Sequence, residues 1–308
     1  MNINKIHPEL RRLAKKLPPV PIHYYWLLRI MRFTLKMMAR KRPCLEGVLT
    51  QDIPLKHGEI RVYQPGGDKS GVGVLWIHGG GFVSGCVSMD DPICSRYVRE
   101  LNAVVISVEY RLAPEHPYPA GSDDIFDAWL WFVGNAGKLG VDPNRIIIAG
   151  QSGGGGQAAF LAQRILDFGG VQPMAQLLFC PMLDDRTCNN QTLDKEKHLL
   201  WNNKNNRAAW SWYLDCEAGS DEVLESAVPA RRDNLSGLPV TWIGIGDADL
   251  FYAESKVYAE RLELAGVKVE LDVVQGGFHG FEVAAPAAQI TVGYFSRHFS
   301  FIRRVLSS

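Results

Sequence analysis

Ser152 lies at the centre of the segment 150–154, which reads Gly-x-Ser-x-Gly and follows the apolar run 146–149. A helical pattern comes next, so the serine is expected on a strand–turn–helix, the context of a nucleophile elbow. The tight turn would force Ser152 into a strained backbone conformation, and Gly150 and Gly154 remove side chains that would collide with it. The free N–H groups at the start of the following helix favour a developing negative charge.

A second glycine-rich segment, 78–82, reads His-Gly-Gly-Gly-Phe and follows the apolar run 72–77. Three consecutive glycines leave their backbone N–H groups unobstructed and allow a substrate to approach closely. A tetrahedral intermediate of acyl transfer needs two or three such donors aimed at its oxygen. The two segments therefore predict complementary parts of one site, a nucleophile and an oxyanion hole.

A serine hydroxyl is a weak nucleophile and needs a base. Of the eight histidines, His279 fits this role best, because it lies in the glycine-rich segment 275–281 directly after the apolar run 268–274. We expect His78 to orient its own loop and His116 to belong to a rigid turn. The other histidines are not flanked by glycines after a core strand.

The histidine needs a carboxylate that orients it, and two candidates follow the apolar run 240–245. These are Asp247 and Asp249, and spacing alone does not separate them. Either choice gives the chain order serine, acid, histidine, which is the order found in the α/β-hydrolase fold.

The elements that must position these residues follow from the hydrophobic pattern. Continuous apolar runs alternate with helical patterns, which predicts an α/β fold with a mostly parallel central sheet and helices on both faces. The expected strands are 72–77, 103–108, 146–149, 176–179, 240–245 and 267–274. Two segments do not fit the alternation: residues 1–45, and a polar, tryptophan-rich insertion at about 186–232. An insertion of this size inside an α/β unit usually covers a site.

The composition excludes several other classes of function. The 308-residue chain has 46% hydrophobic residues, and 33 basic residues balance 33 acidic ones, so nucleic acid is not an expected partner. The six cysteines form no CxxC pair, which argues against a zinc ribbon or a thioredoxin-like site and suits reduced thiols. With no secretory signal recognised, we expect a cytoplasmic protein.

The stretch 26–40 predicts a basic amphipathic helix, since Arg29, Arg32, Lys36 and Arg40 recur at helical spacing. It is too short and too charged to span a bilayer. One interpretation is an anchor on a membrane surface. The other, which we favour from the sequence, is a helix that buries its wide apolar face against a pocket or the core and keeps its basic side in water.

Several segments in the same order resemble the bacterial hormone-sensitive-lipase-like esterases, also called family IV. The resemblance runs from about residue 45 to the C-terminus and implies the α/β-hydrolase fold. It rests on the glycine-rich loop 78–82 and the elbow 150–154, together with four further segments: 110–120 (YRLAPEHPYPA), 235–239 (LSGLP), 258–262 (YAERL) and 279–281 (HGF).

The resemblance also assigns roles within the site. It makes Asp249 the acid, because the family pattern places that residue nine positions before Tyr258. It implies a catalytic domain at 46–308 and a helical cap formed by residues 1–45 and the insertion at about 186–232. The catalytic residues are then Ser152, Asp249 and His279, the oxyanion donors are the N–H groups of Gly80, Gly81 and Gly153, and the candidate pocket residues are Phe82, Trp210 and Phe281.

The implied activity is that of a serine carboxylesterase, which hydrolyses short-acyl, water-soluble esters through an acyl-enzyme intermediate. No metal or cofactor is expected, the partner is a small-molecule ester, and family members often form homodimers. Two alternatives remain open: an amidase or peptidase with the same triad, and a ligand-binding protein of the same fold without catalysis. The second is disfavoured, because such proteins lose a triad member and this chain keeps all three.

The chain departs from the family pattern at three places. Gln151 stands where the family usually has Asp or Thr, which predicts weaker support of the oxyanion loop. Gly153 stands where Ala is usual and would loosen the elbow, and Tyr252-Ala253 replaces an Arg-Asp pair. These departures are expected to change rate and substrate range more than reaction type.

Overall fold

A computed structural model describes residues 3–17, 21–39 and 44–308. Its centre is an eight-stranded sheet in the order β1-β2-β4-β3-β5-β6-β7-β8, in which the β1–β2 and β2–β4 pairs are antiparallel and all other pairs are parallel. The strands are β1 (Val48–Pro54), β2 (Glu59–Pro65), β3 (Gly71–Ile77), β4 (Val104–Glu109), β5 (Val141–Gln151), β6 (Ala175–Phe179), β7 (Val240–Gly246) and β8 (Val269–Val274). All six expected strands are present, whereas the β1–β2 hairpin was not predicted.

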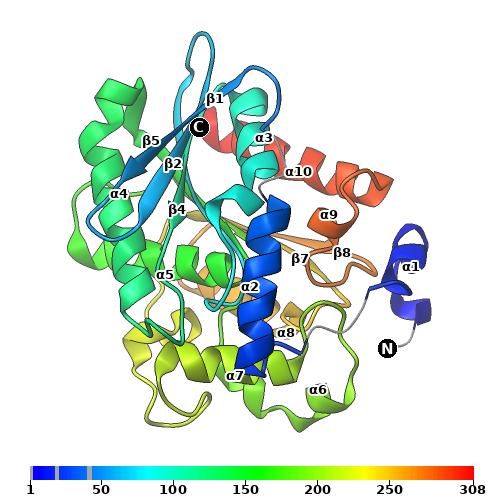
Figure 1. Ribbon diagram of the computed structural model, residues 1–308. Coiled ribbons are helices and arrows are strands. Elements are labelled where there is room, and N and C mark those ends of the chain that lie inside the picture. The colour runs from blue at the N-terminus through cyan, green and yellow to red at the C-terminus, as the bar shows by residue number, and fades with distance from the viewer. Residues whose placement is uncertain (1–2, 18–20, 40–43) are drawn as a thin grey trace.

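Alternate residues of the central strands face opposite layers, as the pleat requires. In β3, Val74 and Trp76 belong to one apolar cluster, while Leu75 and Ile77 belong to the other. The first cluster is completed by α1 (Pro8–Ala14), α3 (Asp91–Leu101) and α10 (Gln289–Leu306), and the second by α4 (Ala120–Leu139), α5 (Gly153–Phe168) and α8 (Tyr252–Leu264). Helices therefore cover both faces of the sheet, which confirms the predicted fold class (Figure 1).

The insertion between β6 and β7 contains α6 (Gln191–Lys195) and α7 (Asn203–Leu214) with short 3₁₀ turns, Asp185–Asn189, Glu225–Ala227 and Pro229–Arg231. Its aromatic residues Trp210 and Tyr213 form a third apolar cluster with Phe82, from the glycine-rich loop, and with Leu28 of α2 (Tyr25–Ala39). Figure 1 shows α6 and α7 at one side of the sheet, where the lower end of α2 meets α7. The insertion thus packs onto the loop that follows β3.

Buried carboxylates fix the start of this insertion. Glu254 of α8 accepts hydrogen bonds from the backbone N–H groups of Leu183 (2.7 Å) and Asp184 (3.3 Å) and from the Thr187 hydroxyl. Asp185 is fully buried and forms an ion pair with Arg231 (2.8 Å). Because a buried carboxyl without partners is costly, these contacts define one path for the chain.

The N-terminal segment does not pack as one unit. Leu10 and Ala14 of α1 belong to the apolar cluster that includes α10, and the backbone N–H of His7 donates to the carbonyl of Gly276 (3.0 Å). The part around α2 contacts the insertion, where His23 lies 3.2 Å from the side-chain amide oxygen of Asn205.

The packing of α2 bears out part of what we favoured from the sequence, since Leu28 is buried and Arg29 and Lys36 are exposed. Two features differ: Trp26 and Phe33 face solvent, and the Arg32 guanidinium is turned inward and contacts the carbonyl of Val83 (2.6 Å). They differ because the helix has apolar residues on two sides, and only the row that contains Leu28 is buried. Arg40 lies outside the described residues. Within the described ranges, no helix is long and apolar enough to cross a membrane.

Candidate active site

Ser152 stands between the end of β5 and the start of α5 with φ 55° and ψ −120°. A positive φ at a non-glycine residue costs about 1–3 kcal/mol and persists only where the surroundings impose it. Here the backbone N–H of Ser152 donates to the carbonyl of Phe179 (2.8 Å), and its carbonyl accepts from the N–H groups of Gly156 and Met182 (both 3.0 Å). The flanking backbone therefore holds the strained turn.

The glycines on either side of Ser152 leave no room for a side chain. A Cβ added to Gly150 would lie 2.2 Å from the carbonyl oxygen of Gly154, and one added to Gly154 would lie 2.2 Å from the carbonyl oxygen of Ile77. Both contacts are with backbone atoms, which have little freedom to move away. The elbow can therefore pack against the end of β3 only because both positions are glycine.

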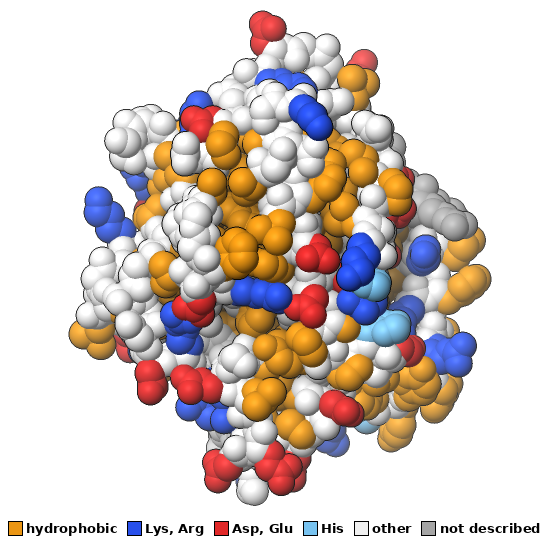
Figure 2. Space-filling view, turned by 90° about the vertical axis from the view of Figure 1, so that its left-hand side faces the viewer, with side chains coloured by type: hydrophobic (Ala, Val, Ile, Leu, Met, Phe, Trp, Pro, Cys, Tyr) orange, Lys and Arg blue, Asp and Glu red, His pale blue; other side chains and the backbone are white. Residues whose placement is uncertain are grey.

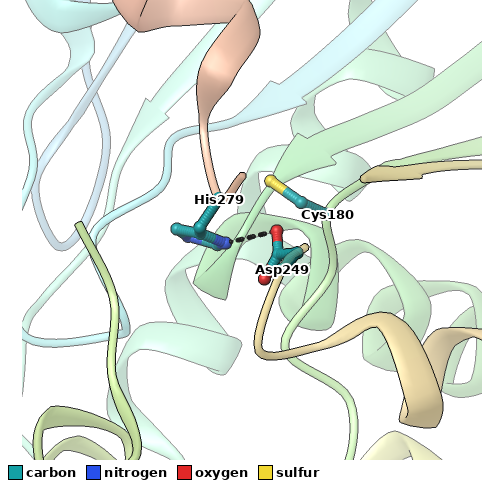
Figure 3. Close-up of side chains that lie close together, drawn as sticks. All are labelled: Cys180, Asp249 and His279. Carbon is teal, nitrogen blue, oxygen red and sulfur yellow. Dashed lines mark hydrogen bonds and ion pairs between the residues drawn. The ribbon is translucent and has the colours of Figure 1, made fainter. Parts of the chain in front are cut away.

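The structure brings Ser152, His279 and Asp249 together from three loops at the carboxyl ends of strands. His279 Nε2 lies 3.0 Å from Ser152 Oγ, and its Nδ1 lies 2.8 Å from Asp249 Oδ2. Figure 3 shows the imidazole turned toward the carboxylate, with His279 on the loop before α9 (Phe281–Ala284) and Asp249 on the loop before α8.

The geometry separates the two carboxylates that spacing left open. Asp249 contacts the imidazole, and its other oxygen accepts the backbone N–H of Phe251 (3.0 Å). Asp247 instead accepts the backbone N–H of Gly276 (2.6 Å), at the beginning of the loop that carries His279. Asp247 therefore supports the loop, while Asp249 orients the ring.

The glycine-rich loop lies directly against the elbow. Gly80 and Gly81 have φ values of 118° and 60°, in the region that favours glycine. A Cβ added to Gly153 would lie 2.9 Å from the backbone nitrogen of Gly81 and 2.8 Å from that of Phe82. None of the N–H groups of Gly80, Gly81 and Gly153 donates to another described residue, so these three donors are free for a ligand.

Two opposing effects set the pKa of His279. Burial disfavours the imidazolium and lowers the pKa, but the negative charge and hydrogen bond of Asp249, aided by the charge of Glu282, outweigh it. The net result raises the pKa of His279 above its ordinary value of 6.5. The imidazole is therefore a stronger base than it would be in water.

Cys180, Asp249 and His279 have ligand atoms within 4.8 Å of one another, which is close enough to hold a metal ion (Figure 3). These three side chains are nevertheless poor ligands for a metal ion. Burial raises the pKa of the Cys180 thiol well above its ordinary value, and the charges of Glu282 and Asp249 add to this effect, so the thiolate needed for ligation is disfavoured. Both ring nitrogens of His279 already face partners, Asp249 and Ser152.

The candidate pocket residues lie in two different places. Phe82 and Trp210 are in contact, with ring centroids 4.8 Å apart, and Tyr213 lies 4.4 Å from Phe82. Phe281 belongs to the cluster beneath the sheet, where it packs on Tyr294 at 5.3 Å. The structure therefore does not bring Phe281 together with the other two.

Sequence reasoning missed a tryptophan that lies directly against the glycine-rich loop. A Cβ added to Gly81 would lie 2.2 Å from the Trp201 ring, and the ring centroid of Trp201 is 6.3 Å from that of His279. Its indole N–H is buried and has no hydrogen-bond partner among the described residues. The richness of the insertion in tryptophan was the available signal, but it did not show which ring faces the site.

Glu282, three residues after His279, was also missed. Gln151 donates from its side-chain amide to Glu282 Oε1 (2.5 Å), so this departure from the family pattern links the elbow to the segment that follows the histidine. The prediction that the oxyanion loop has weaker support assumed that the Gln151 side chain contacts that loop, and not Glu282. Burial raises the pKa of Glu282, whereas the hydrogen bond from Gln151 opposes that rise.

The sheet topology, the strained elbow and the Ser152–His279–Asp249 contacts define a hydrolase of the α/β-hydrolase fold. A family model for that fold matches residues 74–283. The chain is 37% identical over 248 residues to carboxylesterase NlhH of Mycobacterium tuberculosis, and this match covers 79% of this chain and 76% of that protein. It is 30% identical over 228 residues to an ethyl acetate hydrolase of Pseudomonas putida, and this match covers 72% of this chain and 70% of that protein.

Solved structures agree with these relatives. A bacterial heroin esterase superposes over the full length of both chains with a TM-score of 0.91 and 33% identity. The esterase LipW of Mycobacterium marinum gives a TM-score of 0.90 and 29% identity, over 100% of this chain and 98% of that one. The chain belongs to the α/β-hydrolase fold family. The predicted resemblance to hormone-sensitive-lipase-like esterases is confirmed, and so is the class of enzyme, a serine carboxylesterase.

The tight contact at Gly153 leads to the first prediction. In Gly153→Ala the new methyl group displaces the Gly81–Phe82 backbone and misaligns the free N–H groups of the loop and the elbow, so we expect kcat for a nitrophenyl ester to fall by about 10²-fold with a smaller change in KM. Gly134→Ala is the matched control, because a Cβ there meets nothing within 4 Å. An unchanged or higher kcat in Gly153→Ala would contradict this interpretation. This test is sharp because alanine is the usual residue of the family at this position.

The second prediction concerns pH. Only the neutral imidazole can accept the serine proton, so kcat/KM should rise with pH through a midpoint above 6.5, in line with the raised pKa of His279. In Asp249→Asn the attraction that raised this pKa is lost, so the midpoint moves to lower pH and kcat falls by about 10⁴-fold. Asp247→Asn should leave the midpoint in place. A midpoint that stays fixed in Asp249→Asn would refute the assignment.

Proposed function

We propose that Ser152 attacks the carbonyl carbon of an ester while His279 Nε2 accepts its proton. The 3.0 Å separation of these two atoms is the observation that carries this proposal. Asp249 holds the Nδ1 proton of the imidazole and stabilises the imidazolium that forms. The carbonyl oxygen becomes an oxyanion and accepts hydrogen bonds from the N–H groups of Gly80, Gly81 and Gly153.

Collapse of this intermediate expels the alcohol, which takes the proton back from the imidazolium and leaves an acyl group on Ser152. Water then enters, gives a proton to His279 and attacks the acyl carbon. The second intermediate breaks to release the carboxylic acid and restore the serine hydroxyl. The same donors serve both intermediates, because the oxyanion occupies the same position in each.

We assign the acyl group to a short chain. Phe82 lies against both Trp210 and Tyr213, so aromatic side chains already fill the space beside the glycine-rich loop. Trp201 borders Gly81 on another side, which limits the room above Ser152. The relative named ethyl acetate hydrolase agrees in substrate size. Small, water-soluble esters are therefore the proposed substrates.

The remaining proposals concern the protein as a whole. The insertion at about 186–232 acts as a cap together with α2, which is supported by their shared apolar cluster with Phe82. A cytoplasmic location is supported by the six free cysteines. A homodimer through the sheet edge is supported by the terminal position of β8 in the sheet.

The test compares an ester and an anilide that share the same acyl group, across a series of acyl lengths. We expect the short acyl esters to be hydrolysed fastest, the anilides to react far more slowly, and Ser152→Ala to abolish turnover of all of them. Equal rates for the matched anilide would favour an amidase. Turnover that persists in Ser152→Ala would show that another residue is the nucleophile.

A further inference from the structure

A row of large apolar side chains on α2 faces solvent. Trp26, Ile30, Phe33 and Met37 lie at positions i, i+4, i+7 and i+11, so they share one face of the helix, and we call them the exposed stripe. Their exposed fractions are 62%, 54%, 69% and 44%. Isolated apolar residues on a surface are ordinary, but a continuous row marks an interaction site.

The rest of the helix fixes the exposed stripe in this outward position. Arg32 lies on the inner side, where its guanidinium donates to the carbonyls of Val83 (2.6 Å) and Ala113 (2.5 Å) and pairs with Glu115 (2.7 Å). Leu28 is fully buried beside these contacts. Rotation of α2 to bury the stripe would break the ion pair and both hydrogen bonds, so the stripe is a constant feature of the surface.

The charged side chains of α2 itself are all basic. Arg29 and Lys36 are exposed on one flank, and the helix contains no acidic residue. Lys36 also borders a cavity that is lined by Glu59 and Glu109, whereas Arg29 has no partner among the described residues. Figure 2 shows that hydrophobic side chains also reach the surface elsewhere, but there basic and acidic side chains are both interspersed among them, unlike on α2.

A second copy of this chain fits the exposed stripe poorly. Two α2 helices that pack antiparallel about a two-fold axis would bring Arg29 and Lys36 of each copy together, with no carboxylate on either helix to pair with them. A single row of four side chains also falls short of the ~800 Å² that each partner buries in a standard interface. An anionic lipid surface suits both the small apolar area and the basic flank, since it accepts a narrow apolar face and attracts the flanking cations.

We propose that α2 docks the protein onto an anionic phospholipid surface through the exposed stripe. Trp26, Ile30, Phe33 and Met37 enter the boundary between headgroups and acyl chains, and Arg29 remains at the level of the phosphates. Arg32 contacts the carbonyl of Val83, two residues after Gly81, so α2 lies beside the glycine-rich loop while the exposed stripe is on the side of the helix that faces away from it. Docking does not depend on the proposed function.

Co-sedimentation of the full-length protein with vesicles tests this proposal. The vesicles are made of ether-linked phosphatidylcholine with or without ether-linked phosphatidylglycerol, so hydrolysis does not alter them. We expect binding to the anionic vesicles that weakens as salt is raised. Phe33→Glu should weaken binding about tenfold or more, since it places a charge in the apolar layer, and Arg29→Glu should weaken binding to the anionic vesicles alone.

Phe168→Glu is the matched control, because Phe168 is 64% exposed on α5, on another part of the surface, and its replacement should leave binding unchanged. Circular dichroism and esterase activity report whether each variant is folded. Absence of binding by the unaltered protein, or equal binding by Phe33→Glu, would overturn the proposal. A dimer of the unaltered protein that Phe33→Glu converts to a monomer in light scattering, with no vesicle binding, would overturn it in favour of a second copy.

Discussion

The close approach of two backbone segments, at the ends of β3 and β5, determines everything else in the site. The elbow and the glycine-rich loop touch through backbone atoms, because a Cβ added to Gly154 would lie 2.4 Å from the carbonyl oxygen of His78. Neither segment could occupy this position with a side chain in between. The free N–H groups of Gly81 and Gly153 lie at that contact, and backbone hydrogen bonds to Phe179 and Met182 hold Ser152 in its strained conformation beside it.

The rest of the molecule supplies charge and cover. Asp249 and Glu282 raise the basicity of a buried imidazole that burial alone would weaken, and Gln151 connects Glu282 back to the elbow. Aromatic residues of the insertion close the space over the glycine-rich loop. Exclusion of water strengthens each of these interactions, because the local dielectric constant falls. The aromatic cover and the charges around His279 therefore reinforce each other.

Much of this arrangement could be predicted from the sequence because its signals are local. The glycine pattern around Ser152 and the loop position of His279 follow from short segments whose backbone geometry few other residues allow. The β1–β2 hairpin gave no such signal, since most residues of β1 are exposed and form no apolar run. Trp201 and Trp210 could not be ranked, because only the path of the insertion decides which ring reaches Gly81. The exposed side of α2 was missed for a related reason: apolar residues on two sides of a helix do not reveal which side stays in solvent.

The central claim is that His279 and the neighbouring amides make one hydroxyl, that of Ser152, reactive. The most direct test is covalent labelling with a nitrophenyl phosphonate, followed by mass spectrometry of the intact protein and of its peptides. We expect one adduct per chain, on the peptide that contains Ser152, and a labelling rate that falls by several orders of magnitude in His279→Gln. An adduct on a different residue, or an unchanged rate in His279→Gln, would contradict the claim.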